Sequence, residues 1–314
     1  MVKKTVLVKK EVISILKKYN LSKLSKFSLI KRGCVHSNYA LKTTKDKFIL
    51  RIYEERTKEQ ISLEIKLLNK LSKFDIPIPK IIKSNKGNYC EKFNKKNIAI
   101  FTFLKGKHIK DENASINQIK SIGINMAKFH KSLKGFKPKE SSSKHPYNKK
   151  WVKKILANVK KDLPDLPEKY IDFVNTTLKE IKISSNLPKG LNHADFHDDN
   201  VLFKDEKISG IIDFDDCFYG NLLSDVGSSI GFWCIQKRIN FKKCRSFIES
   251  YNSERTLTTN EKKSLFNQTK LFMLIHTIYW LWDKNNWKRE IKPFEVVKKL
   301  NKIGEKEFYK KIFS

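Results

Sequence analysis

The segment that most constrains the fold of this chain is LNHADFHDDNVLFKDEKISGIIDFDD, residues 191–216. Two short β-rich runs, VLF and ISGIIDF, flank the polar sequence KDEK, a pattern that predicts a β-hairpin. If the turn centres on Glu206 and Lys207, residues equidistant from it lie opposite each other. Asn200 and Asp213 then become cross-strand neighbours with Cβ atoms about 5 Å apart. The segment therefore predicts two oxygen-bearing side chains at the open end of a hairpin.

These side chains have the chemistry of a metal and phosphate site. The amide oxygen of Asn200 and the carboxylate of Asp213 suit Mg²⁺, which takes oxygen ligands and keeps water and phosphate as the others. Asp195 precedes them in the loop that enters the hairpin, where a carboxylate can orient a substrate hydroxyl and accept its proton. The spacing H-x-D-x-x-x-x-N followed by I-D-F is that of kinase catalytic and metal-binding loops. The alternative, that each residue only closes a turn, explains any one of them but not their joint spacing.

Further acidic residues gather in the same segment, although the chain carries 66 Lys and Arg against 33 Asp and Glu, a formal net charge of +33. A bound cation relieves repulsion among such carboxylates, and exposed lysines do the same. Asp215 is a candidate contact for a second metal or for the substrate. Asp198 and Asp199 fit ordinary solvated loop positions. We expect His193 to support the loop structurally.

The first third of the chain predicts a small mixed lobe. The expected elements are a helix at 9–19, strands within 28–53, a helix at 59–73 and a buried strand at 97–104. Within KFILRIY, strand alternation places Arg51 on the face opposite Phe48, so that Arg51 is available to a ligand.

Arg51 and Glu64 have the strand-then-helix placement of a kinase cation and its carboxylate partner. Arg51 would then hold nucleotide phosphates by a forked contact that Glu64 fixes, whereas the alternative for Glu64 is a solvated helix position. The loop KRGCVHSNYAL contributes Gly33, Ser37 and Asn38 as further candidate nucleotide contacts. With a single glycine it matches neither G-x-G-x-x-G nor a Walker loop, and an ordinary hairpin connection is the alternative.

The rest of the chain predicts a second, mainly helical lobe. Segments with helical spacing are 116–134, 151–161, 168–181, 239–251, 261–282 and 294–312. The polar stretch 134–150 predicts a loop inside this lobe.

Composition excludes several classes of protein. With 39% apolar residues, including 21 Phe, the chain can fill a core, which excludes intrinsic disorder and collagen-like repeats. The longest strongly apolar stretch, from Leu271 to Trp282, is shorter than the roughly 18–20 residues that span a bilayer. The start MVKKTVLVKKEV lacks the apolar region of a secretory signal, so we expect a cytoplasmic protein with no membrane partner.

Cysteine content and charge argue against a zinc site and against a nucleic-acid partner. The five cysteines are scattered, with no C-x-x-C pair and no His at metal spacing, which predicts reduced thiols and no zinc site. The cationic residues are mostly lysines spread along the whole chain. That distribution is typical of a solvated surface, and no specific nucleic-acid partner is expected.

With these motifs the sequence resembles the aminoglycoside-phosphotransferase-like, choline-kinase-like small-molecule kinases, and among them the homoserine kinases. The stretches that carry the likeness are GCVHSNYALKTTKDKFILRIYEER, IPIPKII, FLKGKHI, LNHADFHDDNVLF with SGIIDF, and DVGSSIGFWC with FIESYNSERTLTTNE. The resemblance implies an α+β, protein-kinase-like two-lobed fold. A nucleotide-binding lobe at 1–104 would contain a small antiparallel sheet and a helix, and a larger, mainly α-helical lobe at 105–314 would contain the catalytic hairpin.

The same resemblance implies roles for individual residues. Asp195 would be the catalytic base, Asn200 and Asp213 the ligands of Mg²⁺, and Arg51 the cation that binds the phosphates of ATP. Asp225, in LLSDVGS, matches an aspartate expected to brace the catalytic loop. The implied cofactors are therefore ATP and Mg²⁺.

The implied reaction is phosphorylation of a small-molecule alcohol, first of all L-homoserine in threonine biosynthesis. IDFDDC has acidic residues where the homoserine kinases commonly carry an aromatic and then a small or polar residue, and Gly231 stands where Asn or Asp is frequent. Extra negative charge suits a more cationic alcohol, so choline, methylthioribose and aminoglycosides stay open as substrates. A basic nucleic-acid-binding module on a kinase-like scaffold is the alternative from another class.

Overall fold

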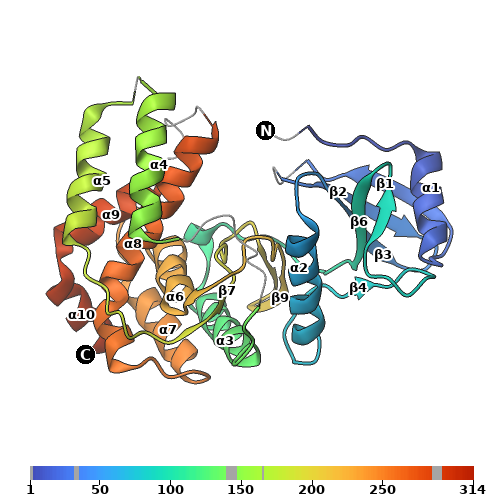
Figure 1. The fold of residues 1–314 in the computed structure, drawn as a ribbon. Helices are drawn as coiled ribbons and strands as arrows, with labels where there is room; N and C mark the ends of the chain where they lie inside the picture. Colours follow the sequence, from blue (N-terminus) through green and yellow to red (C-terminus); the bar gives the residue numbers. More distant parts are fainter. Residues whose placement is uncertain (1–2, 32–34, 139–146, 165, 285–291) are drawn as a thin grey trace. The chain divides into compact units, whose positions relative to one another are not determined.

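The structure is a computed structural model that describes residues 3–31, 35–138, 147–164, 166–284 and 292–314 (Figure 1). The chain divides into two compact units. The first consists of Met1–Lys105 and Gly210–Ile212, and the second of Gly106–Ser209 and Asp213–Ser314. An antiparallel sheet dominates the first unit and helices dominate the second, which confirms the predicted α+β class.

The first unit is built on one antiparallel sheet with the strand order β1-β2-β3-β6-β4, and β5 pairs with β6 beside it. Its strands are β1 (Leu24–Leu29), β2 (Ser37–Thr43), β3 (Lys47–Tyr53), β4 (Ile81–Ile82), β5 (Glu91–Phe93) and β6 (Lys96–Thr102). Helices α1 (Lys9–Lys18) and α2 (Lys58–Leu71) lie on opposite sides of the sheet (Figure 1). Thr57 caps α2, because its hydroxyl accepts the Gln60 N–H and the Gln60 side chain accepts the Thr57 N–H.

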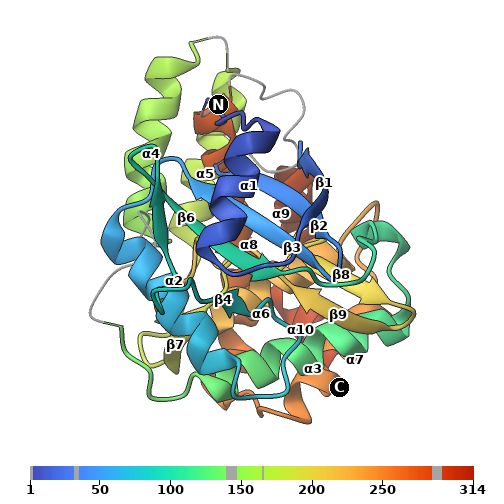
Figure 2. The same ribbon diagram turned by 90° about the vertical axis from the view of Figure 1, so that its right-hand side faces the viewer.

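Strand alternation in β3 separates the core of the first unit from the face that carries the candidate phosphate-binding residue Arg51. Leu50 and Ile52 are fully buried in one cluster with Val12 and Ile15 of α1. Arg51 lies between them in sequence and therefore projects from the other face of the sheet. Figure 2 shows α1 lying across the strands on the core side.

The second unit consists mainly of helices. They are α3 (Ile116–Ser132), α4 (Lys149–Asp162), α5 (Glu168–Glu180), α6 (Leu223–Ser229), α7 (Phe241–Asn252), α8 (Thr259–Lys284), α9 (Lys292–Ile303) and α10 (Glu305–Phe313), with a short 3₁₀ turn at Asp111–Asn113 and a π-helical turn at Ile230–Cys234. The segment 294–312, predicted as one helical stretch, forms two helices because Gly304 adopts a φ of 76° between them. In the predicted loop 134–150, residues 139–146 lie outside the described residues.

Two short antiparallel strand pairs flank the candidate functional segment, and their residues belong to the second unit except Gly210 and Ile211 at the end of β9. Strand β7 (Lys189–Asn192) pairs with β10 (Phe218–Asn221), and β8 (Val201–Lys204) pairs with β9 (Lys207–Ile211). The second pair is the predicted hairpin, but its turn is Asp205–Glu206, with a φ of 55° at Asp205. The predicted register, which centred the turn on Glu206 and Lys207, is therefore wrong.

This shift changes the positions of the candidate metal ligands. Asn200 stands immediately before β8, and Asp213 lies beyond the end of β9 at Ile211. Neither residue belongs to the strands, so the predicted cross-strand pairing of their side chains is also wrong. The turn centres one residue earlier than predicted, between Asp205 and Glu206, so that counting outward from it brings Ile211 rather than Asp213 opposite Asn200.

Helix α8 approaches α6 and the π-helical turn closely because small residues line that contact. A Cβ added to Gly227 would lie 3.0 Å from the backbone nitrogen of Thr269, and one added to Gly231 would lie 2.5 Å from Sδ of Met273. The absence of side chains at these two glycines lets α8 pack directly against the preceding segment. Among the described residues, no helix is long and apolar enough to cross a membrane.

A buried carboxylate in the first unit makes its stability dependent on pH. Glu54, whose side chain is 2% exposed, accepts hydrogen bonds from Lys96, from the Ser37 hydroxyl at 2.5 Å and from the Thr5 amide at 2.9 Å. Burial alone would raise the pKa of Glu54, but these bonds lower it from 4.5 to about 2. The ionised form is thus favoured in the folded state.

We predict that Glu54→Gln lowers the free energy of unfolding at pH 7 by on the order of 1–2 kcal/mol, since the Lys96 partner is partly exposed and screened. The stabilisation by Glu54 is fully present above pH 4.5 and is lost as the pH falls toward 2, so the difference between wild type and variant closes over that interval. Urea unfolding at a series of pH values measures it. Glu55→Gln, at an exposed neighbouring position, is the control, and a difference that stays constant with pH contradicts the prediction.

Candidate active site

The loop between β7 and β8, residues 193–200, carries the candidate catalytic residues. Its backbone turns sharply, since the amide of His197 donates to the Asp195 carbonyl and that of Asn200 to the His197 carbonyl, both at 3.0 Å. Trp233 of the π-helical turn anchors the loop by donating its indole N–H to the Phe196 carbonyl at 2.8 Å. The direction of the candidate catalytic side chains is therefore set by the backbone of this loop.

Asp225, in the first turn of α6, holds the start of the loop. Its carboxylate accepts the amide of His193 at 2.7 Å and the amide of Ala194 at 2.9 Å. The same carboxylate contacts Nε2 of His130 on α3 at 3.1 Å, and both side chains are fully buried. These are bracing contacts of the kind that the family resemblance implied for Asp225.

A chain of polar contacts continues from His130 toward α8. Nδ1 of His130 lies 2.7 Å from the Tyr251 hydroxyl, which accepts a hydrogen bond from Arg255 at 3.0 Å. Arg255 in turn donates to Glu261 at 2.8 Å. Because the chain is buried and each member has a partner, it fixes the carboxylate of Asp225 rigidly.

Both carboxylate oxygens of Asp195 are engaged. Nδ2 of Asn200 donates to Oδ2 at 2.7 Å and also to the Asp195 carbonyl at 3.0 Å. Oδ1 lies 2.7 Å from Nε2 of His197. Burial would raise the pKa of Asp195, but the charge and hydrogen bond of His197 hold it well below its usual range. Asp195 is therefore ionised and fixed in direction.

His197 is a candidate site residue that the sequence analysis missed. Burial would lower its pKa, but the charges of Asp195 and its other carboxylate neighbours raise it to about 10. Its Nδ1 lies 3.2 Å from the Asp199 amide and 3.5 Å from Oδ1 of Asp198. A neutral His197 ring could accept the Asp199 amide at Nδ1, whereas a protonated ring donates to a carboxylate. The negative charge around His197 favours the protonated ring. The only signal in the sequence was a second His in the dense segment HADFHDDN.

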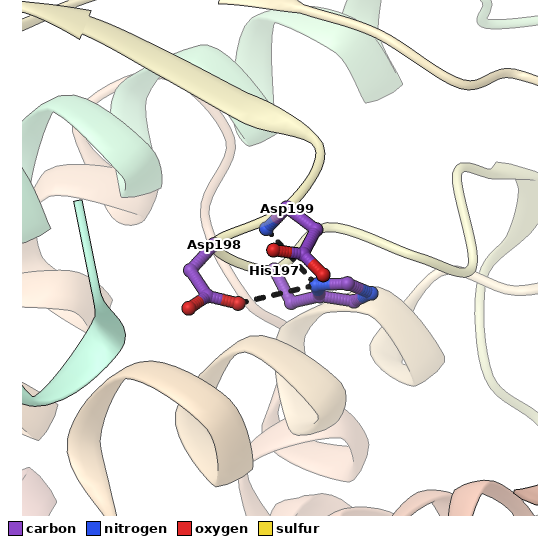
Figure 3. Close-up of side chains that lie close together, drawn as sticks. All are labelled: His197, Asp198 and Asp199. Carbon is purple, nitrogen blue, oxygen red and sulfur yellow. Dashed lines mark hydrogen bonds and ion pairs between the residues drawn. The ribbon is translucent and has the colours of Figure 1, made fainter. Parts of the chain in front are cut away.

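Figure 3 shows His197, Asp198 and Asp199 together, the one group of His, Cys, Asp or Glu side chains among the described residues whose ligand atoms lie close enough to hold a metal ion. The contacts of these residues indicate that the group belongs to an ion-pair network. His197 pairs with Asp195, and Lys110 donates to Asp198 at 3.2 Å. The carboxylates of Asp195 and Asp198 are thus each paired with a cationic side chain. Asp198, expected to be an ordinary solvated residue, is instead part of this ion-pair network.

The candidate metal ligands remain Asn200 and Asp213. Both hydrogen bonds described for Asn200 use Nδ2, so its Oδ1, the atom that a hard cation binds, takes part in neither. Asp213 adopts a φ of 68°, a left-handed conformation that Asp tolerates better than most residues. The donor set of one amide and one carboxylate oxygen fits Mg²⁺. Asp215, the candidate second contact, lies two residues further along the chain, and its role stays a prediction.

His193 lies in the core of the second unit and has no exposed surface. Its ring packs edge-on against Phe196 and Phe214, with ring centroids 5.5 and 4.9 Å apart. Its Nδ1 accepts the Asp195 amide at 3.4 Å. The His193 side chain thus supports the loop from the core of the second unit.

The candidate nucleotide residues of the first unit form a separate cluster. Nη1 of Arg51 donates to Oε1 of Glu64 at 3.0 Å, and the Tyr53 hydroxyl donates to Oε2 at 2.8 Å. Nε of Arg51 donates to Oδ1 of Asn38 at 3.1 Å. Glu64 is therefore buried and paired, not a solvated helix residue. The structure brings together Arg51, Glu64 and Asn38.

The other two candidates of this loop are not part of that cluster. Ser37 has no exposed surface, and its hydroxyl is committed to Glu54, so this side chain is not available to a nucleotide in the structure. Gly33 lies outside the described residues.

A cavity of about 440 Å³ lies along β10 and α8 of the second unit, with Phe218, Ser224 and Gln268 among its lining residues. Neither Asp195 nor Asn200 lines it. It is therefore distinct from the candidate catalytic loop.

A sheet-based unit with a buried Arg–Glu pair, and a helical unit with a braced Asp–Asn loop, define a small-molecule kinase. Residues 26–245 match the phosphotransferase enzyme family, and the chain belongs to this family. The match includes both Arg51 and the loop 193–200.

Curated relatives of similar length are homoserine kinases. That of Bartonella henselae is 31% identical over 255 residues, which cover 80% of this chain and 78% of the relative. That of Methylobacillus flagellatus is 28% identical over 250 residues, which cover 78% and 76%.

Solved structures share the fold at lower sequence identity. An amicoumacin kinase in complex with AMP-PNP has a TM-score of 0.68 and 15% identity, and the match covers 97% of this chain and 94% of the other. A microcompartment-associated aminopropanol kinase has a TM-score of 0.66 and 17% identity, with 97% and 99% covered.

We predict that Asp225→Asn destabilises the second unit by about 2–4 kcal/mol, because an amide offers one oxygen where the carboxylate accepts two backbone amides and a histidine. Chemical denaturation measures the loss. Asp162→Asn, at an exposed position on α4, is the matched control and should change the free energy of unfolding by less than about 0.5 kcal/mol. Equal effects of the two substitutions contradict the bracing role.

Proposed function

We propose that this kinase transfers the γ-phosphoryl group of ATP to the hydroxyl of L-homoserine. The observation that carries the catalytic part is Asp195, whose carboxylate is ionised and held at both oxygens by Asn200 and His197. The substrate part is supported by the homoserine kinases that match most of the chain.

In this proposal Asp195 orients the acceptor hydroxyl and takes its proton. The low pKa of Asp195 makes it a weak base, which suits a loose transition state in which the proton leaves late. Most of the rate then comes from holding the hydroxyl in line with the phosphoryl group. The bracing of the loop by Asp225 serves that requirement, since it limits the movement of Asp195.

Asn200 and Asp213 would hold Mg²⁺ through their side-chain oxygens. When bound, the ion neutralises charge on the phosphates of ATP. Because Nδ2 of Asn200 donates to Asp195, the amide oxygen of Asn200 is directed away from the base. One side chain thus serves the orientation of the base and the candidate metal site together.

Arg51 would bind the phosphates of ATP from the first unit. Its guanidinium is fixed by Glu64 and Asn38, and the Arg51 side chain is 12% exposed. The pairing with Glu64 keeps the side chain extended, so that little conformational entropy is lost on binding. We propose ATP and a small alcohol as ligands in preference to nucleic acid, because the cationic residues are mostly lysines spread along the whole chain.

We predict that Asp195→Ala lowers kcat by about 10²–10⁴-fold, the usual contribution of a positioned general base, while ATP binding is largely retained. A coupled assay of ADP release and a nucleotide titration measure the two effects. Asp205→Asn, in the exposed turn of the same hairpin, is the control and should keep normal turnover. Unchanged turnover in Asp195→Ala refutes the role of Asp195.

We expect L-homoserine to give the highest kcat/KM in a panel with choline, methylthioribose, an aminopropanol and an aminoglycoside. Detection of the phosphorylated product by mass spectrometry identifies the acceptor. Preference for another alcohol overturns the substrate and leaves the kinase assignment intact.

A further inference from the structure

Tyr251 of α7 lies at the centre of the buried chain of polar contacts behind the candidate catalytic loop. It belongs to the stretch FIESYNSERTLTTNE, to which the proposed phosphotransfer assigns no role. Its side chain has no exposed surface, and burial raises the pKa of its hydroxyl, so Tyr251 keeps its proton. A buried hydroxyl proton needs an acceptor. The identity of that acceptor therefore determines what Tyr251 does in the structure.

Close packing of α7 against α3 places Tyr251 beside His130. A Cβ added to Gly123 of α3 would lie 2.6 Å from the carbonyl oxygen of Phe247 on α7, so glycine is required for this approach. His130 lies two turns after Gly123 on α3. Tyr251 lies one turn after Phe247 on α7, so both side chains project from the faces in contact. The two rings meet edge to face with centroids 5.8 Å apart, and the hydroxyl lies 2.7 Å from Nδ1.

Arg255 determines the direction of the hydrogen bond between Tyr251 and His130. Among the described residues, the Tyr251 hydroxyl has two polar partners, Nη1 of Arg255 at 3.0 Å and Nδ1 of His130 at 2.7 Å. A guanidinium has donors only, so it cannot accept the hydroxyl proton. The O–H of Tyr251 therefore points at Nδ1, which must be the unprotonated nitrogen of the ring.

A capping box at the start of α8 holds Arg255 in place. The Glu261 amide donates to the Thr258 hydroxyl at 3.2 Å, and the Glu261 carboxylate accepts the Thr258 amide at 2.8 Å. The other carboxylate oxygen of Glu261 accepts from Nη2 of Arg255 at 2.8 Å. Because Glu261 has no exposed surface, this ion pair compensates a buried charge. The guanidinium is thereby fixed with its other nitrogen toward Tyr251.

We propose that Tyr251 is a positioning residue that keeps His130 in the neutral form with its proton on Nε2. In this form Nε2 donates to Oδ2 of Asp225 at 3.1 Å, and Nδ1 accepts from Tyr251. The other neutral form would turn a lone pair toward the carboxylate and leave the O–H of Tyr251 without an acceptor. A doubly protonated ring would leave the same O–H unsatisfied. The kinetic consequence of this inference rests on the proposed phosphotransfer, whereas the structural consequence does not.

The form of the His130 ring matters because Asp225 is shared with the loop. Its Oδ2 also accepts the amide of His193 at 2.7 Å, and its Oδ1 accepts the amide of Ala194 at 2.9 Å. Ala194 has a φ of 71°, a conformation that persists only where its surroundings hold it. A ring free to turn or to move its proton would loosen the carboxylate of Asp225 and the two amides bound to it. Tyr251 thus acts on the loop of the candidate base through two intervening side chains.

The protonation state of His130 is measurable directly. In protein labelled with ¹⁵N-histidine, two-bond and three-bond ¹H–¹⁵N correlations distinguish the two neutral forms from the doubly protonated ring, and His130→Gln identifies the signal by its loss. We expect the proton on Nε2 at pH 7. In Tyr251→Phe we expect the Nδ1 resonance to move to higher frequency, because Nδ1 loses its hydrogen bond. A wild-type ring protonated at Nδ1 or at both nitrogens, or an unmoved Nδ1 resonance in the variant, overturns the proposal.

Hydrogen–deuterium exchange at the amides of His193 and Ala194 measures the effect on the loop and needs no substrate. We expect Tyr251→Phe, which keeps the ring and deletes the hydroxyl, to speed their exchange about threefold to tenfold, the weight of one net hydrogen bond, while α5 exchanges as in the wild type. Tyr19→Phe is the matched control, because it deletes another buried hydroxyl, which donates to the Ile98 carbonyl at 3.3 Å in the first unit. Wild-type exchange at both amides in Tyr251→Phe contradicts the positioning role.

His130→Gln separates this role from a general loss of packing. A glutamine amide places an N–H near the position of Nε2 and needs no partner to fix its proton. In this background Tyr251→Phe should change exchange and turnover by less than about twofold, because the effect of Tyr251 passes through His130. The same change in both backgrounds shows that Tyr251 does not act through His130 and refutes the inference.

Steady-state kinetics give the functional readout with the alcohol that the panel identifies. We expect Tyr251→Phe to lower kcat about threefold to tenfold with little change in the KM for ATP or for the alcohol, whereas Tyr19→Phe keeps normal turnover. Unchanged kcat, or a change confined to one KM, overturns the effect on the candidate base. If the wild type phosphorylates no alcohol, the proposed function fails, and the NMR and exchange experiments still decide the role of Tyr251.

Discussion

One buried carboxylate supports the whole candidate site. Asp225 accepts hydrogen bonds from two consecutive backbone amides, those of His193 and Ala194, and contacts His130 in the same buried environment. A buried charge is stable only when its partners satisfy it, and here three donors converge on two oxygens. The loop that carries Asp195 is thereby tied to α6 and α3, so the packing of those helices determines where the candidate base lies.

The same segment is under backbone strain, and the strained residues are close in sequence to the candidate catalytic and metal-binding residues. Ala194 and Asp213 both have positive φ values, next to the candidate base and at a candidate metal ligand. Such conformations persist only where the surroundings enforce them. At Ala194 the carboxylate of Asp225, itself held by the buried network through His130 and Tyr251, provides this enforcement. Rigidity at this site fits a reaction in which positioning supplies most of the rate.

Local patterns predicted the elements well where one periodicity dominated. The helix at 9–19, the alternation around Arg51 and the hairpin after Asn200 all follow from spacing within a few residues. The register of the hairpin was wrong because it depends on the turn type, here set by a left-handed Asp205. The division of 294–312 into two helices likewise depends on one residue, Gly304, with a positive φ.

From the sequence alone, the residue types and spacing of the loop around Asp195 and Asn200 determined the class of chemistry, because metal and phosphate sites need oxygen ligands in a fixed order along the chain. Only the tertiary structure decided which distant side chains hold that loop. His130 and Tyr251 come from α3 and α7, and nothing in their local sequence marks them as supports of the loop. The reason is physical: a contact between separate helices depends on how those helices pack, which no short stretch of sequence encodes.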